Sequence, residues 1–300
     1  MSIASQLTGK LVPLTYRSVI RLSGPDTRKF LQGIASNDFI RDQSPSFYSV
    51  FMNPKGKLFS DSFVHIDEKD TVYLDVPTNY LPNVTKMLSM SMFGRKVELS
   101  VAEAMKVYGI IGKVEDGLPC FPDSRYKKGH VFRSYLETAP SSSPQLTSLF
   151  KSYELIHGVW SADDGLKNQV AAHLNLDQLN GVSTKKGCYV GQETYTAYMH
   201  HHPHPTRLVS VLLTNHFHNA MTSLNAEQVC NDLPATHILQ PIEGVQTGSE
   251  VAETVSGKSQ TVGTLLYVQP KWNVGLVLCN EFEGVKGPWS VGPMQCLPIL

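Results

Sequence analysis

Residues 12–111 alternate between strand-like and helix-like patterns, and this order constrains the fold more than any other feature of the chain. Apolar residues at helical spacing occur twice, after Asp26 and from Leu81 to Phe93, whereas the remaining runs are short and favour strands. The resulting order, β-α-β-β-β-α-β-β, predicts an α+β fold of the split βαβ kind. The predicted strands span residues 12–22, 47–52, 58–66, 71–76, 96–101 and 106–111.

The pattern changes after Pro205. A helix is predicted from Leu146 to His157, and beyond residue 205 short apolar runs are separated by Gly and Asn turns. Such runs, at 208–213, 261–268 and 274–278, are typical of a small antiparallel β-barrel. We therefore predict an α+β domain of residues 1–205 and a barrel domain of residues 206–300.

The charge balance argues against a polyanion partner. The chain has 26 basic and 26 acidic residues, and strong nucleic-acid binding depends on neutralising phosphates. We expect no direct nucleic-acid contact, although a net charge of zero is compatible with a local basic patch. Because no apolar run approaches about 18 residues, we expect no membrane span and no membrane partner.

Two features bear on the compartment. Five scattered cysteines without a C-x-x-C pair indicate free thiols in a reducing environment. The first 25 residues contain no acid and carry Lys10, Arg17 and Arg21, as presequences do. The same residues from 11 to 22 also predict the first strand, which would leave only about ten residues for a transit peptide.

Residues 186–193, Lys-Gly-Cys-Tyr-Val-Gly-Gln-Glu, are the strongest candidate site. They place Cys188 between two glycines, which permit unusual backbone angles, and near Lys186, whose charge favours a thiolate. A short helix is predicted from Gly191 to Tyr198, and its N-terminal amides would favour an anion further. The alternative is a buried cysteine that acts as a small hydrophobe, and that is how we interpret Cys120, Cys230, Cys279 and Cys296.

Residues 176–193 resemble, as one unit, the signature of the YgfZ-type folate-binding family, a branch of the glycine-cleavage T-protein superfamily. The family includes mitochondrial iron–sulfur cluster assembly factors of the IBA-fifty-seven (CAF-seventeen) type. Further stretches of similarity, at 20–38, 53–57, 263–266 and 273–277, are distributed so that the resemblance spans essentially the whole chain.

The resemblance implies two ferredoxin-like units around a central channel, followed by a small β-barrel. In the superfamily that channel can hold tetrahydrofolate. The family's role implies maturation of [4Fe–4S] client enzymes in the mitochondrial matrix together with A-type carrier proteins, and we expect a monomer when the chain is alone. The implied motif and pocket residues are Lys186, Gly187, Cys188, Tyr189, Gly191, Gln192, Glu193, Asn37 and Asp38; for Asn37 and Asp38 ordinary capping is an equal alternative.

The aminomethyl transfer of the T-protein is predicted to be lost. By resemblance, the T-protein uses an aspartate near its pocket, expected here in the helix after the strand 71–76. Residues 77–96 contain no Asp or Glu, and the transfer needs a positioned acid or base. If folate binds, it is then a ligand without a part in a transfer reaction, or its site is an evolutionary remnant. The chain would be a transferase only in the sense that it resembles a transferase family.

Cys188 becomes the leading functional group, since a thiolate is a natural ligand for iron. One cysteine cannot hold a [2Fe–2S] cluster, so we expect a transient cluster shared with a partner that supplies the other ligands. The alternatives are thiol exchange or radical repair at Cys188, a true tetrahydrofolate-dependent transferase, and an accessory role in RNA modification. The histidine tract 200–204 is either metal-binding or, as we favour, a solvated loop.

Overall fold

The computed structural model describes residues 1–41, 44–67, 71–137, 143–201, 206–214, 223–232, 244–255, 258–269, 273–280 and 289–300. The chain divides into two compact units. Unit 1 consists of Met1–Leu7, Ser148–Trp160 and His200–Leu300, and unit 2 consists of Thr8–Thr147 and Ser161–Met199. The predicted boundary near Pro205 lies outside the described residues and stays a prediction.

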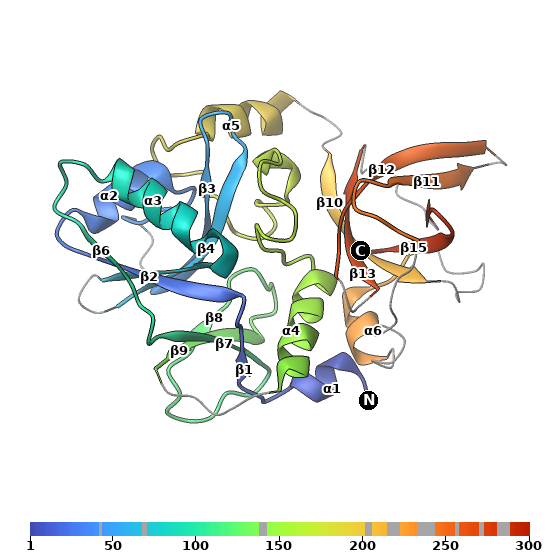
Figure 1. Cartoon of the computed structure of the whole chain (residues 1–300), viewed down its shortest axis with the longest axis horizontal. Coiled ribbons are helices and arrows are strands. Elements are labelled where there is room, and N and C mark those ends of the chain that lie inside the picture. Colours follow the sequence, from blue (N-terminus) through green and yellow to red (C-terminus); the bar gives the residue numbers. More distant parts are fainter. Residues whose placement is uncertain are drawn as a thin grey trace. The chain divides into compact units, whose positions relative to one another are not determined.

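Unit 2 contains a five-stranded antiparallel sheet in the order β3-β4-β5-β2-β6. Its helices α2 and α3 lie side by side over one face of this sheet (Figure 1). The short turn η1 (Thr78–Tyr80) leads directly into α3. The elements are α2 (Thr27–Ile34), α3 (Leu81–Ser91), β2 (Arg17–Ser23), β3 (Ser46–Met52), β4 (Leu58–Ile66), β5 (Val72–Pro77) and β6 (Glu98–Val101).

The two faces of this sheet differ because side chains alternate along each strand. Toward the helices, the strands present Ile20, Val64 and Leu74, which pack with Phe30 of α2 and Leu88 of α3. The alternate positions on the central strands β2, β4 and β5 carry charged side chains, and these are also buried. The sheet is therefore buried on both faces, one apolar and one charged.

The second sheet of unit 2 has the order β1-β7-β9-β8. Its strands are β1 (Val12–Pro13), β7 (Lys106–Ile111), β8 (Phe121–Pro122) and β9 (Val131–Leu136). The prediction of one strand over 12–22 is wrong: Val12 pairs with Gly109 in this sheet, whereas Arg17 pairs with Pro77 in the other. A turn closed by the Arg17 N–H on the Leu14 carbonyl redirects the chain, just after Pro13, which lacks an N–H for a ladder.

Unit 1 contains a closed antiparallel barrel in which β15 returns to pair with β10. Its interior is filled by side chains such as Val211, Leu265, Val277 and Trp289. The predicted fold class, α+β with a C-terminal barrel, is confirmed. In order around the barrel the strands are β10 (Arg207–Thr214), β13 (Val274–Cys279), β12 (Lys258–Val268), β11 (Glu250–Val255), β14 (Trp289–Val291) and β15 (Met294–Ile299).

Among the described residues, unit 1 includes α1 (Ile3–Leu7), most of α4 (Pro144–Ile156) and α6 (Ala226–Asn231), as well as the last two residues of α5 (Gln192–His201). The sequence did not predict α1, whose Ile3 and Leu7 are fully buried. In the structure these residues pack as part of unit 1, and a transit peptide stays a prediction. Among the described residues no helix is long and apolar enough to cross a membrane.

Candidate functional site

The motif segment 180–191 is hydrogen-bonded to the end of α2 and to the loop that follows it. The Ser183 N–H donates to the Ser36 carbonyl at 3.1 Å, and the Val190 N–H donates to the Gly33 carbonyl at 3.2 Å. The Ser36 hydroxyl in turn donates to the Gly181 carbonyl. These bonds join segments about 150 residues apart in the chain, and they hold the backbone of the motif without involving the Cys188 side chain.

The buried Lys186 side chain also joins the motif segment to the loop after α2. Its Nζ donates to the carbonyls of Ala35 at 2.6 Å and Asn37 at 2.8 Å, and it lies 4.8 Å from the centre of the Tyr189 ring. Burial lowers the pKa of Lys186 to about 8, and the nearby Asp38 carboxylate only partly opposes this. The ammonium therefore serves two carbonyls and an aromatic face. Among the described residues, none of the hydrogen bonds of Lys186 goes to the Cys188 thiol. The expected stabilisation of a Cys188 thiolate by Lys186 is therefore not supported by a direct contact.

Cys188 is the exposed thiol of the chain. Of the five cysteines, Cys230, Cys279 and Cys296 are buried and Cys120 is partly buried. Burial raises the pKa of Cys279 to about 11 and that of Cys296 to about 12, so both stay protonated and unreactive near neutral pH. The neighbouring Gly187 is exposed and would accommodate a side chain freely. Cys188 is thus exposed to solvent, whereas Lys186 and Tyr189 on either side of it are buried.

The second glycine of the motif is required by packing. Gly191 has a φ of 84°, and a Cβ there would lie 2.8 Å from both the Asn53 carbonyl oxygen and the Met52 Cβ. It immediately precedes α5 (Gln192–His201), so the start of this helix sits directly on the hairpin between β3 and β4. Gly187, by contrast, has no positive φ and no close neighbour, so its conformational freedom is not used.

Asn37 and Asp38 stabilise the local backbone. The Asn37 amide donates to the carbonyls of Tyr48 and Asn180, at 2.9 Å each. The Asp38 carboxylate accepts from the backbone N–H groups of Ile40 and Arg41, also at 2.9 Å. Burial works to raise the pKa of Asp38, but these hydrogen bonds outweigh it and the pKa is lowered. Asp38 therefore stabilises a turn and not a helix end, since no helix begins directly after it among the described residues, and both helix capping and a pocket role for the pair stay predictions.

The remaining motif side chains lie around the start of α5. Tyr189 is buried, Gln192 is half-buried, and Glu193 is exposed in the first turn of the helix, where its charge suits the helix dipole. His200 and His201 end the same helix, while His202 and His204 lie outside the described residues. Within the described part of the chain no group of three or more His, Cys, Asp or Glu side chains is placed to hold a metal ion.

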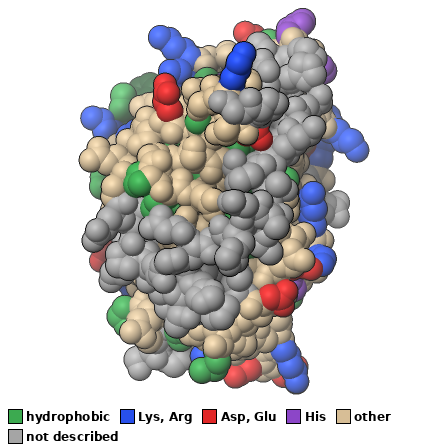
Figure 2. All heavy atoms as spheres, turned by 90° about the vertical axis from the view of Figure 1, so that its right-hand side faces the viewer, with side chains coloured by type: hydrophobic (Ala, Val, Ile, Leu, Met, Phe, Trp, Pro, Cys, Tyr) green, Lys and Arg blue, Asp and Glu red, His purple; other side chains and the backbone are tan. Residues whose placement is uncertain are grey.

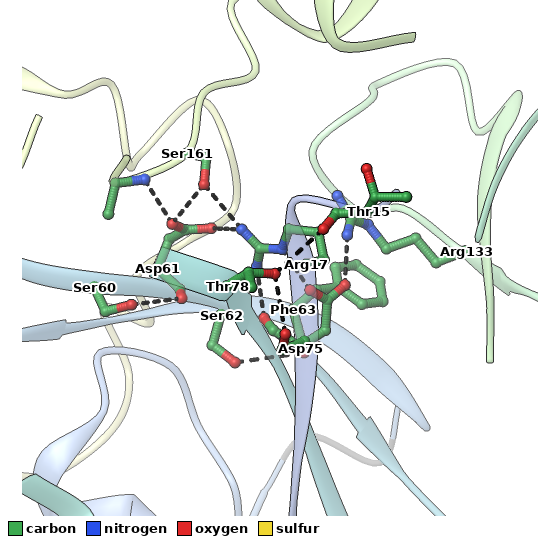
Figure 3. A network of polar contacts seen from close by, with 12 residues as sticks. Thr15, Arg17, Ser60, Asp61, Ser62, Phe63, Asp75, Thr78, Arg133 and Ser161 are labelled. Atoms are coloured by element: carbon green, nitrogen blue, oxygen red, sulfur yellow. Dashed lines mark hydrogen bonds and ion pairs between the residues drawn. The ribbon is translucent and has the colours of Figure 1, made fainter. Parts of the chain in front are cut away.

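A buried network of ion pairs lies on the charged face of the five-stranded sheet, and sequence reasoning missed it (Figure 3). The Arg17 guanidinium bonds both Asp61, at 2.8 Å, and Asp75. Arg133 of β9 also bonds Asp75 and reaches Asp123, which Arg125 bonds as well. The network therefore links the two sheets of unit 2 through alternating charges.

The network is balanced and its carboxylates are paired. Three guanidinium groups face three carboxylates, and Asp61 also accepts from the Ala162 N–H at 2.7 Å. Burial alone would raise the pKa of Asp61, yet Arg17 and this hydrogen bond keep the pKa lowered. The signal in the sequence was a charged residue within each of three strands, Arg17, Asp61 and Asp75, but the pairing of these residues depends on the tertiary register.

Comparisons with known proteins were made by sequence and by structure. A curated protein of Mycosarcoma maydis named "Iron-sulfur cluster assembly factor IBA57 homolog, mitochondrial" is 29% identical over 224 residues, which cover 65% of this chain and 54% of that protein. Proteins of the same name from Pyricularia oryzae and Dictyostelium discoideum are 24% and 26% identical, covering 91% and 61% of this chain and 72% and 57% of those proteins. The resemblance to this family is confirmed. The chain spans about half the length of the first relative.

The structural comparison agrees at the level of fold. The crystal structure of the glycine cleavage system aminomethyltransferase T from Bartonella henselae matches with a TM-score of 0.63 over 96% of this chain and 84% of that one. At 13% identity this similarity shows the T-protein-like fold and nothing about activity. No protein-family model matches the chain.

Proposed function

We propose that this chain is a mitochondrial iron–sulfur cluster assembly factor that works with A-type carrier proteins in the maturation of [4Fe–4S] client enzymes. In this proposal Cys188 supplies one thiolate ligand to a transient [2Fe–2S] cluster, and the partner supplies the others. The relatives' names support the process and the compartment. The cluster is cargo that passes between proteins, so the chain need not hold a complete ligand set.

The observation that carries this proposal is the exposure of Cys188 on a fixed loop. A ligand shared between two proteins must reach beyond its own surface, and among the five cysteines Cys188 is the exposed one. Its neighbours Lys186, Tyr189 and Gly191 are held by hydrogen bonds or close packing. Ordering the loop in advance reduces the entropy lost when a partner docks.

Folate is not needed for this role. Tetrahydrofolate binding is an expectation of the fold family, but the buried carboxylates Asp61, Asp75 and Asp123 are each bonded to a guanidinium, which leaves no free acid in the network for a transfer reaction. Residues 77–96, which include α3, contain no carboxylate either. These residues do not fit the aminomethyl transfer, and no step of the proposed function is derived through folate.

The decisive experiment mixes the protein anaerobically with an A-type carrier that holds a [2Fe–2S] cluster. The visible absorption and circular dichroism of the cluster are recorded for the wild type, Cys188→Ser and Cys120→Ser. We expect the wild type and Cys120→Ser to change the cluster spectrum and form a stable complex, while Cys188→Ser does neither.

An unchanged response of Cys188→Ser would reject Cys188 as the shared ligand. The transferase alternative is tested separately, by titrating tetrahydrofolate while following tryptophan fluorescence and then assaying one-carbon transfer. Turnover in that assay would replace the proposal, whereas binding without turnover is compatible with it.

A further inference from the structure

The helical face of unit 2 carries large apolar side chains in full contact with solvent. Phe93 and Met90, at the end of α3, are 95% and 71% exposed, and Ile40, in the loop after α2, is 54% exposed. Single exposed apolar residues are ordinary on a protein surface. Here Met90 lies in the last turn of α3, Phe93 follows that helix, and Ile40 lies in the loop after α2. Both the segment after α3 and the loop after α2 are hydrogen-bonded to residues at the start of α2, which gives reason to consider the three side chains together.

Both loops are held in place. The Lys96 N–H donates to the Asp26 carboxylate at 2.8 Å, and the Arg95 N–H closes a turn on the Met92 carbonyl at 3.0 Å. On the other side the Arg28 guanidinium donates to the Phe39 carbonyl at 2.7 Å. The segments that carry Phe93 and Ile40 are therefore both held by hydrogen bonds to residues at the start of α2.

The same face is basic in a chain that is neutral as a whole. Lys86, Arg95, Lys96 and Arg41 are exposed, and the Arg41 guanidinium also donates to the Lys185 carbonyl at 2.8 Å. The nearest exposed acid after Lys96 is Glu98 on β6. Two of the acids, Asp26 and Asp38, accept hydrogen bonds from backbone N–H groups. Residues 24–43 and 77–97 together contain six basic and three acidic residues, namely Arg28, Lys29, Arg41, Lys86, Arg95 and Lys96 against Asp26, Asp38 and Asp42.

This charge excess is local. Figure 2 shows the face that lies on the right in Figure 1, and there the described basic and acidic side chains are scattered among one another. A basic stretch that carries exposed apolar side chains, in a chain that is neutral as a whole, has the pattern of a peripheral membrane protein. A Phe that is 95% exposed has no need of a matching pocket in a fluid bilayer, whereas a protein partner would have to provide one.

We propose that this face, the α2–α3 face, binds the surface of an anionic membrane: Phe93, Met90 and Ile40 enter the headgroup region, and Lys86, Arg95, Lys96 and Arg41 contact the lipid phosphates. The contact is peripheral and reversible and requires no membrane-spanning helix. It therefore departs from the sequence-based expectation of no membrane partner, which rested only on the lack of a spanning apolar run. It extends beyond cluster assembly and does not depend on Cys188.

The test is co-sedimentation of the full chain with vesicles of phosphatidylcholine alone and with about one third phosphatidylglycerol. We expect binding to the anionic vesicles only, weakened by salt because the basic residues contribute. Met90→Ser with Phe93→Ser should weaken binding about tenfold or more, and Lys86→Glu should weaken it by a smaller factor. The matched controls are Leu300→Ser, an exposed apolar residue of unit 1, and Lys113→Glu, an exposed lysine outside this face.

A fluorescent reporter makes the insertion itself visible. The emission of Phe93→Trp should shift to the blue with anionic vesicles and stay unchanged with neutral ones. No binding of the wild type to anionic vesicles would overturn the proposal. Binding that the serine variants leave intact, or that soluble poly-glutamate or RNA competes away without any shift of Phe93→Trp, would also overturn it, because simple charge attraction would then suffice.

Discussion

Unit 2 contains two groups of functional-looking residues that behave in opposite ways. The ion-pair network around Asp75 holds six charged side chains, all buried and bonded to one another. The motif around Cys188 holds one exposed thiol on a loop whose neighbours are buried and bonded. The comparison teaches that the buried charges of unit 2 hold its two sheets together, whereas the candidate reactive group, the Cys188 thiol, is exposed.

The largest effect is expected from breaking the network. Asp75→Ala leaves the guanidinium groups of Arg17 and Arg133 buried without their shared carboxylate, and removing one partner of a buried pair costs about 3–5 kcal/mol. The free energy of unfolding in urea measures this loss. Asp116→Ala, at an exposed position, is the control and should change it by less than about 0.5 kcal/mol. Equal stability of the two variants would mean that the network does not stabilise the fold.

The cysteines should separate sharply in reactivity. In the native protein we expect a thiol reagent such as dithionitrobenzoate to modify Cys188 about a hundredfold faster than Cys230, Cys279 or Cys296, because burial blocks access and raises the pKa of each of those thiols. The fast phase should vanish in Cys188→Ser and persist in Cys120→Ser. A fast phase that survives in Cys188→Ser would show that another thiol is open.

The two glycines of the motif give a matched pair. Gly191→Ala should cost about 1–3 kcal/mol, because alanine is strained at a positive φ and its Cβ would collide with the hairpin 52–53. Gly187→Ala should cost less than about 0.5 kcal/mol, since its surroundings are open. Urea unfolding of both variants checks this difference, and similar costs would show that packing against the hairpin is unimportant.

The smallest effect concerns Lys186 and pH. Its pKa is about 8 in the folded protein and 10.5 in an unfolded chain, so the unfolded state holds the proton longer as the pH rises. Stability should therefore rise between pH 8 and pH 10.5 relative to a Lys186→Met variant, by about 1 kcal/mol after allowance for solvent screening. Urea midpoints of both proteins at pH 7.5 and pH 10 test this. A difference between the proteins that does not vary with pH would mean that the lysine's pKa is not lowered.

The sequence predicted the local features well because they depend on local patterns. The strand at 106–111, the hairpin around residues 53–56 and the helix starting near Gly191 are all present. It failed where distant segments decide the outcome. Nothing local reveals that the chain changes sheets between Pro13 and Arg17, or that Lys186 bonds the carbonyl of Ala35. The Arg17–Asp75 pair likewise depends on the register of β2 against β5.

The make-up of unit 1 has a consequence for how the chain is synthesised. This unit joins the first seven residues, a central stretch and the final hundred, and α1 packs against α6 within it. α1 therefore waits for a partner helix that is made much later in translation, since contacts of such sequence separation form late. Ile3 and Leu7 stay exposed during that interval, which makes this segment a natural substrate for chaperones.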